Sequence, residues 1–240
     1  MSEPLKIAFV VEGPTDFIML KTVIANLLQG RDFVPQVLQP EMSEAFKPGP
    51  GEDGGWPGVC RWCLQSVQQG GGRLSNNPLF GFHDLLILHL DADVAGGHYS
   101  AGHIPDPFPE PTLPCEEPCP PPSATTNRLR AVTLLWMRET VTPSRVVLCM
   151  PSKALETWLL VGLFPDDSVA QRVDVECHHN PADPLQGKPL ECRLVRSGRK
   201  DREMYQKCAP EFARNWNTVT TRCSEAARFE NDFLCALAQL

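Results

Sequence analysis

Residues 85–93 read Leu-Leu-Ile-Leu-His-Leu-Asp-Ala-Asp, and this stretch decides the fold. Five of its first six residues are leucine or isoleucine, the exception is His89, and the carboxylates of Asp91 and Asp93 close it. A nearly continuous apolar run of this length, bounded by polar residues, is typical of a strand buried on both faces of a parallel sheet. Side chains alternate along a strand, so we expect Asp91 and Asp93 to point to the same side at its carboxyl end, where open α/β sheets bind ligands.

Strands and helices are expected to alternate on both sides of this stretch. Apolar runs predict further strands at residues 6–11, 33–38 and 145–150. Helical patterns predict helices at residues 14–29, 58–69 and 125–140, with a glycine- and proline-rich loop at residues 46–58. Another helix is expected to open at residues 151–153, with Ser152 as its N-cap. This order predicts an α/β fold with a parallel sheet of about four strands and helices on both faces.

We expect the chain to divide into two parts. Residues 1–163 form the α/β domain, and they include a proline-rich insertion at about residues 95–123, with nine prolines from Pro105 to Pro122. This insertion is longer than most functional loops. Residues 164–240 form a C-terminal extension, which is expected to be irregular at first and then helical, at about residues 202–220 and 224–237.

Composition narrows the class of protein. Hydrophobic residues make up 42% of the 240 residues, enough for a normal core. The net charge of −7 argues against non-specific binding of nucleic acid by the whole surface, although a local basic face is compatible with it. No apolar run reaches about 18 residues and the N-terminus has no signal-peptide pattern, so we expect a cytoplasmic protein without membrane contact. Most of the ten cysteines are then expected to be reduced thiols in the core.

Three carboxylates form the strongest candidate site. Glu12 ends the first strand, and Asp91 and Asp93 end the third, so all three are expected at the same edge of the parallel sheet. Mg²⁺ prefers oxygen ligands and is usually held by one or two carboxylates together with substrate phosphates. A third carboxylate binds a second metal or serves as general acid or base. The alternative is that each acid only caps a helix or ends a strand.

The same residues carry a resemblance to a known family. A strand that ends in Val-Glu-Gly-Pro-Thr-Asp (residues 11–16), followed by one that ends in Asp-Ala-Asp (residues 91–93), resembles the toprim domain of the topoisomerase–primase type. The likeness is greatest to the small toprim-type nucleases of bacterial defence systems, the OLD and RloB-like groups. Residues 151–160, Pro-Ser-Lys-Ala-Leu-Glu-Thr-Trp-Leu-Leu, are also similar to a segment of that branch. The proline-rich insertion departs from the family pattern.

The resemblance implies a toprim-like Rossmannoid domain and a phosphodiester chemistry that depends on Mg²⁺ or Mn²⁺, with DNA or RNA as substrate. It implies Glu12 as general acid or base and as a contributor to the metal site, Asp91 and Asp93 as metal ligands, and Glu156 as a further acidic contributor. Members of the family often work beside an ABC/SMC-type ATPase that senses phage. A homodimer is left open.

Two further groups of residues are candidates for binding. A basic stretch in an otherwise acidic chain predicts contact with a phosphate backbone, and its candidate residues are Arg196, Arg199 and Lys200. Lys153, near the end of the fourth strand, is a further candidate for contact with a phosphate. The alternative is a solvated charged face. Zinc is a weaker prediction, from cysteines and histidines in the insertion, namely His98, His103, Cys115 and Cys119. Their spacing matches no recognised zinc knuckle.

Three functions are compatible with these patterns. The first is a metal-dependent nuclease. The second is a nucleotide-sugar glycosyltransferase, whose Asp-x-Asp also ends a buried strand, although Glu12 has no expected role there. The third is a non-catalytic module that binds a partner through the proline-rich insertion and the basic stretch. A strand-passing topoisomerase is disfavoured, because neither Tyr99 nor Tyr205 has the context of a DNA-linking nucleophile.

Overall fold

The computed structural model describes residues 3–40, 54–104 and 110–240. In these residues a four-stranded sheet has the order β2-β1-β3-β4, and every neighbouring pair is parallel. The strands are β1 (Leu5–Val10), β2 (Phe33–Gln39), β3 (Leu85–His89) and β4 (Val146–Cys149). The prediction of an α/β fold with a parallel sheet of about four strands is therefore confirmed.

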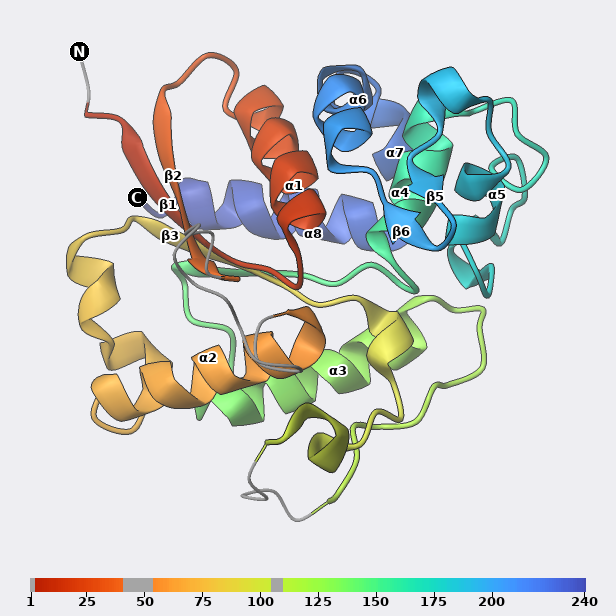
Figure 1. The fold of residues 1–240 in the computed structure, drawn as a ribbon. Helices are drawn as coiled ribbons and strands as arrows, with labels where there is room; N and C mark the ends of the chain where they lie inside the picture. The colour runs from red at the N-terminus through yellow and green to blue at the C-terminus, as the bar shows by residue number, and fades with distance from the viewer. Residues whose placement is uncertain (1–2, 41–53, 105–109) are drawn as a thin grey trace.

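Helices cover both faces of the sheet, as predicted (Figure 1). One face carries α1 (Pro14–Leu27) and α8 (Ser224–Leu237), and the other carries α2 (Gly55–Gln69) and α3 (Ser123–Met137). Alternate residues of β3 enter the two cores, because Leu85 and Ile87 pack with the first pair of helices and Leu86 and Leu88 with the second. Each of these side chains is fully buried, which stabilises the fold by about 1.5–3 kcal/mol per residue. Burial on two sides explains the continuous apolar run.

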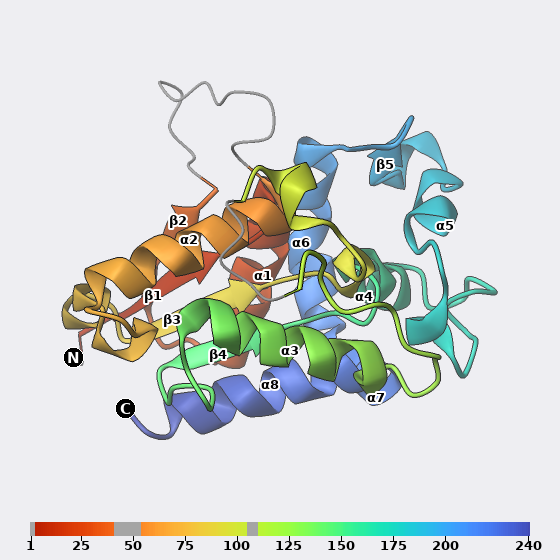
Figure 2. The same cartoon turned by 90° about the horizontal axis from the view of Figure 1, so that it is seen from below.

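The remaining elements gather beside one end of the sheet (Figure 2). They are α4 (Leu155–Leu163), α5 (Ala182–Gln186), α6 (Arg202–Arg214), α7 (Trp216–Arg222) and a two-stranded antiparallel sheet of β5 (Val195–Arg196) and β6 (Arg199–Lys200). Helix α6 packs against α1 and α4. Buried residues of the C-terminal part, such as Tyr205 and Phe229, therefore share one core with Ile7 and Phe9 of β1.

Several predicted boundaries are wrong. Strand β3 ends at His89, and residues Ala92–Val94 form a 3-10 turn, so the strand alternation expected for Asp91 and Asp93 does not apply. Helix α4 begins at Leu155 with Ala154 as its N-cap, instead of near Ser152. The helix expected at residues 202–220 divides into α6 and α7 at Asn215. Residues 46–53 of the expected loop lie outside the described residues, and Gly55 already begins α2.

The β5–β6 hairpin was not predicted. Its turn residues, Ser197 and Gly198, have φ values of 49° and 73°. Two successive residues with positive φ fit a tight hairpin turn, whose twist matches that of the flanking strands. The Ser-Gly pair was the available sequence signal, but strands of two residues carry no readable alternation.

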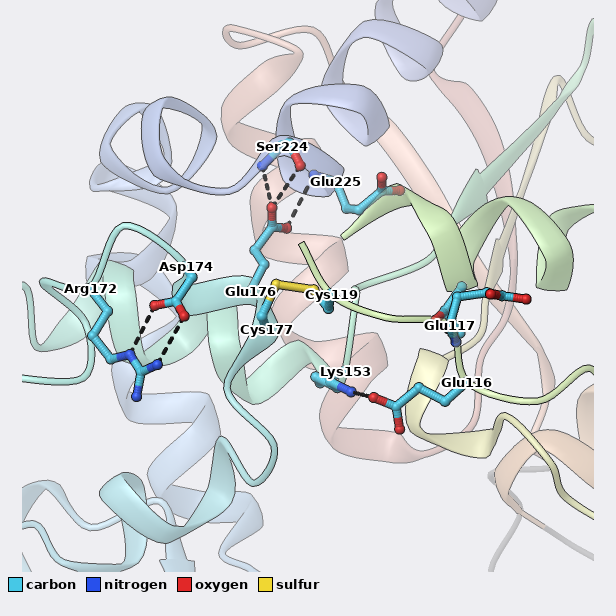
Figure 3. Close-up of a disulfide and its surroundings, with 11 residues drawn as sticks. Glu116, Glu117, Cys119, Lys153, Arg172, Asp174, Glu176, Cys177, Ser224 and Glu225 are labelled. Carbon is cyan, nitrogen blue, oxygen red and sulfur yellow. Dashed lines mark hydrogen bonds and ion pairs between the residues drawn. A yellow bond between two sulfur atoms is a disulfide. The ribbon is translucent and has the colours of Figure 1, made fainter. Parts of the chain in front are cut away.

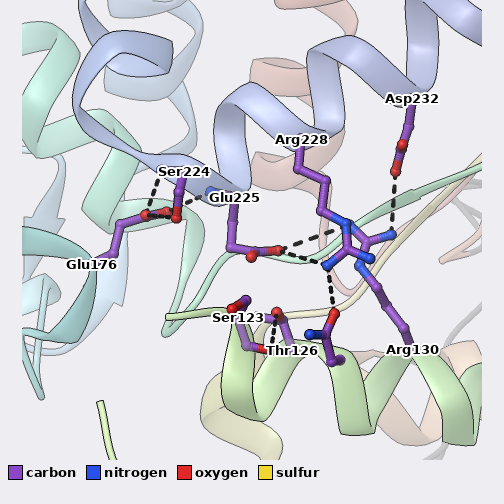
Figure 4. Close-up of polar contacts among 9 residues, drawn as sticks. Ser123, Thr126, Arg130, Glu176, Ser224, Glu225, Arg228 and Asp232 are labelled. Atoms are coloured by element: carbon purple, nitrogen blue, oxygen red, sulfur yellow. Dashed lines mark hydrogen bonds and ion pairs between the residues drawn. The ribbon is translucent and has the colours of Figure 1, made fainter. Parts of the chain in front are cut away.

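Polar contacts attach α8 to its neighbours (Figure 4). The carboxylate of Glu176 accepts hydrogen bonds from the backbone N–H groups of Ser224 and Glu225 and from the Ser224 hydroxyl, which satisfies donors in the first turn of the helix. Farther along, Arg130 of α3 donates to Asp232 of α8 at 3.4 Å.

Within the described part of the chain, no helix is long and apolar enough to cross a membrane.

Candidate functional site at the carboxyl edge of the sheet

Glu12 and Asp91 meet at the carboxyl edge of the sheet. Glu12 follows β1 and immediately precedes Gly13 and Pro14, which start α1. Its carboxylate oxygen Oε1 accepts a hydrogen bond of 2.7 Å from the backbone N–H of Asp91. Its backbone carbonyl accepts another, of 2.8 Å, from the N–H of Gly55 at the start of α2. The structure thus brings together two of the residues that the sequence analysis singled out, although they are far apart in the chain.

Asp91 is held by two further groups. Its Oδ1 accepts a hydrogen bond of 3.0 Å from the N–H of Leu155, the first residue of α4, where the helix dipole favours a negative charge. The same oxygen lies 3.1 Å from Nε2 of His89, which is fully buried. Burial by itself lowers the pKa of His89, but the carboxylate of Asp91 outweighs it and raises this pKa to about 9. At neutral pH His89 therefore places a positive charge beside Asp91.

Asp93 lies at the rim of the site. It is in the 3-10 turn after β3, and its backbone N–H donates to the carbonyl of Lys153 at 2.9 Å. Its side chain is exposed, yet partial desolvation and the carboxylates of Asp91 and Glu156 raise its pKa to about 7. As the side chains are arranged, the described residues contain no group of three or more histidine, cysteine, aspartate and glutamate side chains that could hold a metal ion. The expected cluster is therefore a pair, with Asp91 buried and Glu12 half-buried, and Asp93 lies beside it.

Glu156 belongs to a second polar group next to this pair. It lies in the first turn of α4, is buried, and accepts a hydrogen bond of 2.6 Å from the Tyr205 hydroxyl of α6. Lys200 Nζ lies 2.8 Å from Glu156 Oε1 and 3.2 Å from Asp16 Oδ1. Burial lowers the pKa of Lys200, but the carboxylates of Asp16 and Glu156 outweigh it, so the pKa is raised and Lys200 remains charged.

Three members of the site, Asp16, His89 and Tyr205, were not predicted from the sequence. Asp16 lies in the first turn of α1, and it was visible in the sequence only as the last residue of the motif at residues 11–16. His89 was visible as the one polar residue of a buried strand. No pattern in the sequence pointed to Tyr205.

A cavity of about 410 Å³ opens over this arrangement. Its lining comprises Glu12, Gly13, Pro14, Thr15, Asp16, Gly55, Asp91, Lys200 and Arg202. Burial and the neighbouring carboxylate of Asp91 raise the pKa of Glu12 well above its usual value, because two negative charges at this wall repel each other. Carboxylate oxygens are the ligands that Mg²⁺ prefers, and two carboxylates with a substrate phosphate are a common set. Glu12 and Asp91 therefore fit a divalent metal.

The four predicted nucleic-acid contacts have different surroundings. Lys200 lines the cavity, whereas Arg196 and Arg199 are exposed on the hairpin outside it. Arg196 also pairs with Asp201 at 3.0 Å. Lys153 is buried and forms an ion pair with Glu116 of the proline-rich insertion (Figure 3). Lys153 is thus engaged within the protein, and Lys200 is the member of the set closest to the carboxylates.

The zinc prediction has to be corrected. Cys119 forms a disulfide with Cys177, with a Cα–Cα distance of 5.5 Å (Figure 3). A sulfur in a disulfide is not a thiolate, so Cys119 is not available to complete the set with Cys115, His98 and His103. The expectation that most cysteines are reduced thiols holds for eight of the ten, and the disulfide of Cys119 and Cys177 is the exception. The expectation arose from the assumed compartment, which says nothing about which cysteines are close in space.

Comparisons with protein-family models, with curated proteins and with solved structures give no match to this chain. The arrangement of side chains in the cavity is therefore the evidence for the chemistry of this site. The arrangement combines a carboxylate pair suited to a hard cation with cationic side chains, Lys200 and Arg202, that line the same cavity. Such a cavity can take a ligand that carries phosphate groups.

Proposed function

We propose that this protein is a metal-dependent nuclease of the toprim type, which cleaves phosphodiester bonds in DNA or RNA. The observation that carries the proposal is the position of Glu12 and Asp91 in one cavity with Lys200 and Arg202. Acidic residues there suit a divalent cation, and the basic residues suit the phosphate backbone that the cation would engage. The resemblance of residues 11–16, 91–93 and 151–160 to toprim nucleases supports the same function.

Each residue then has a separate role. A bound Mg²⁺ or Mn²⁺ supplies Lewis-acid polarisation of the phosphate. Asp91, which lies beside His89 and accepts from the N–H of Leu155, would hold the ion together with Glu12, and Asp93 would contribute from the rim. With an ion bound, the carboxylate of Glu12 would be ionised, and it would accept the proton of the attacking water as general base. Lys200 and Arg202 would bind the non-reacting phosphate oxygens.

Cleavage of labelled single-stranded DNA, duplex DNA and RNA in the presence of Mg²⁺ or Mn²⁺ tests this proposal. We expect Glu12→Gln and Asp91→Asn to abolish cleavage, as does a chelator, while circular dichroism shows an unchanged fold. Glu191→Gln is the matched control, because Glu191 is exposed and does not line the cavity. Cleavage that survives Glu12→Gln would contradict the proposal. Binding of a nucleotide sugar that is unaffected by Glu12→Gln would favour the glycosyltransferase alternative.

The proposed setting is phage defence in the cytoplasm, beside an ABC/SMC-type ATPase. Its support is the resemblance to the defence nucleases described above. The adjacent genes provide a direct test, since an ATPase encoded there should copurify with this chain and change its cleavage rate. Cleavage assays should therefore include such an ATPase. If the purified chain cuts neither DNA nor RNA with the ATPase present, the proposed nuclease function is contradicted.

A further inference from the structure

Lys200 places a positive charge inside the acidic cavity. Its ammonium lies between two buried carboxylates, 2.8 Å from Glu156 Oε1 and 3.2 Å from Asp16 Oδ1. The side chains of both acids are 3% exposed, whereas that of Lys200 is 37% exposed, so one side of the ammonium faces the cavity. Burial of both carboxylates reduces the solvent screening of these contacts relative to a pair of fully exposed side chains.

The surrounding structure holds Lys200 in this position. The Tyr205 hydroxyl donates to Glu156 at 2.6 Å and so orients one of the two carboxylates. Next to Lys200, Asp201 caps α6 by accepting from the N–H of Met204 at 3.2 Å, and it pairs with Arg196 of the same hairpin. These contacts keep the hairpin against α6 and α1. The ammonium is thus a fixed part of the cavity.

The charged side chains in and next to the cavity form two groups. In one group, Lys200 neutralises part of the charge of Asp16 and Glu156. In the other group, His89 lies 3.1 Å from Asp91, and the carboxylate of Glu12 accepts its hydrogen bond from the backbone N–H of Asp91. A divalent ion would add positive charge where Glu12 and Asp91 share only that of His89, whereas Asp16 and Glu156 already have the ammonium of Lys200 between them.

We propose that the Lys200 ammonium takes the place of a second metal ion, so that the site binds a single divalent cation at Glu12 and Asp91. This inference rests on the proposed metal-dependent function and specifies the number of ions. Lys200 then supplies the second positive charge that faces the substrate phosphate. It acts as a catalytic residue when the substrate is bound and, through its contacts, it also positions Asp16 and Glu156.

Counting bound Mn²⁺ tests the proposal without measuring activity. Isothermal titration calorimetry and electron paramagnetic resonance of Mn²⁺ should give one ion per full-length chain. Lys200→Met removes the ammonium and keeps a similar side-chain length, so we expect this variant to bind two Mn²⁺ ions. The Kd of the second ion should be at least tenfold lower than that of any second ion in the unaltered protein. Lys200→Met combined with Glu156→Gln should return the number to one. Lys6→Met is the control, because Lys6 is exposed on β1 at the opposite end of the strand from Glu12, and it should bind one ion.

Two ions in the unaltered protein overturn the inference, and this measurement needs no variant to fold. A folded Lys200→Met variant that binds one ion with unchanged affinity also overturns it. Failure of this inference can be distinguished from failure of the proposed nuclease function. If the protein binds one ion but cleaves no nucleic acid, the inference is supported and the proposed nuclease function is contradicted. If it binds two ions and cleaves nucleic acid, the inference is contradicted and the nuclease function is supported. A protein that binds no Mn²⁺ contradicts both.

Discussion

Replacing Tyr205 by phenylalanine isolates one hydrogen bond of the site. Tyr205 is fully buried, and its hydroxyl donates to the buried carboxylate of Glu156 at 2.6 Å. The chain offers a matched comparison, because its other tyrosine, Tyr99, is also buried and its hydroxyl accepts from Trp136 Nε1 at 3.0 Å. Both changes remove one oxygen atom from a buried ring. The Tyr205 partner is a carboxylate, whereas the Tyr99 partner is a neutral indole.

The partner of each hydroxyl sets the expected magnitude. A hydrogen bond to a charged group contributes about 1.5–3 kcal/mol to stability, and a neutral one contributes about 0.5–1.5 kcal/mol. Tyr205→Phe leaves Glu156 with Lys200 as a remaining partner, so the buried carboxylate is not isolated. We therefore expect a loss of about 2 kcal/mol for Tyr205→Phe. Tyr99→Phe takes the hydroxyl acceptor from the buried Trp136 N–H, so we expect a loss of similar size, about 1–3 kcal/mol.

Urea denaturation monitored by tryptophan fluorescence measures both losses. The midpoint should fall with an unchanged slope, because neither substitution changes the surface exposed on unfolding. Tyr205→Phe should also alter Mn²⁺ binding or cleavage, since it releases one of the two contacts to Glu156, whereas Tyr99→Phe should not. If Tyr205→Phe leaves the urea midpoint unchanged, the prediction that the hydrogen bond from Tyr205 to Glu156 stabilises the fold is refuted.

Two further predictions concern charge and covalent structure. The pKa of Asp93 is raised from 3.8 to about 7, so its contribution to stability is full below pH 3.8 and is lost as the pH rises to about 7. That shift corresponds to about 4 kcal/mol, which screening of the exposed side chain reduces to about 1 kcal/mol. Asp93→Asn should therefore raise the urea midpoint at pH 8 and leave it nearly unchanged at pH 4; a lower midpoint at pH 8 contradicts this. Replacing Cys119 and Cys177 together by serine opens a loop of sequence separation 58 and should cost about 2–4 kcal/mol. A reducing agent should lower the Tm of the unaltered protein and not that of the double variant; equal effects on both would exclude the disulfide.

The sequence determined the sheet and one edge of the site. Leu85 to Leu88 could be read as a strand because burial on both faces leaves no polar position in the run. The meeting of Glu12 with Asp91 could also be expected, because parallel strands end at the same edge of a sheet and each residue closely follows such an end. Both inferences depend on local patterns and on a general rule of chain topology.

Tertiary structure alone decided the rest. Lys200 is 184 residues from Asp16, and the two meet because α6 packs against α1 and carries the hairpin with it. Which cysteines pair depends in the same way on distance in space, so the link from Cys119 to Cys177 has no sequence signal. Asp93 left the expected position because the backbone turns into a 3-10 helix directly after Asp91. These features follow from contacts between distant segments, which residue patterns along one stretch of chain do not encode.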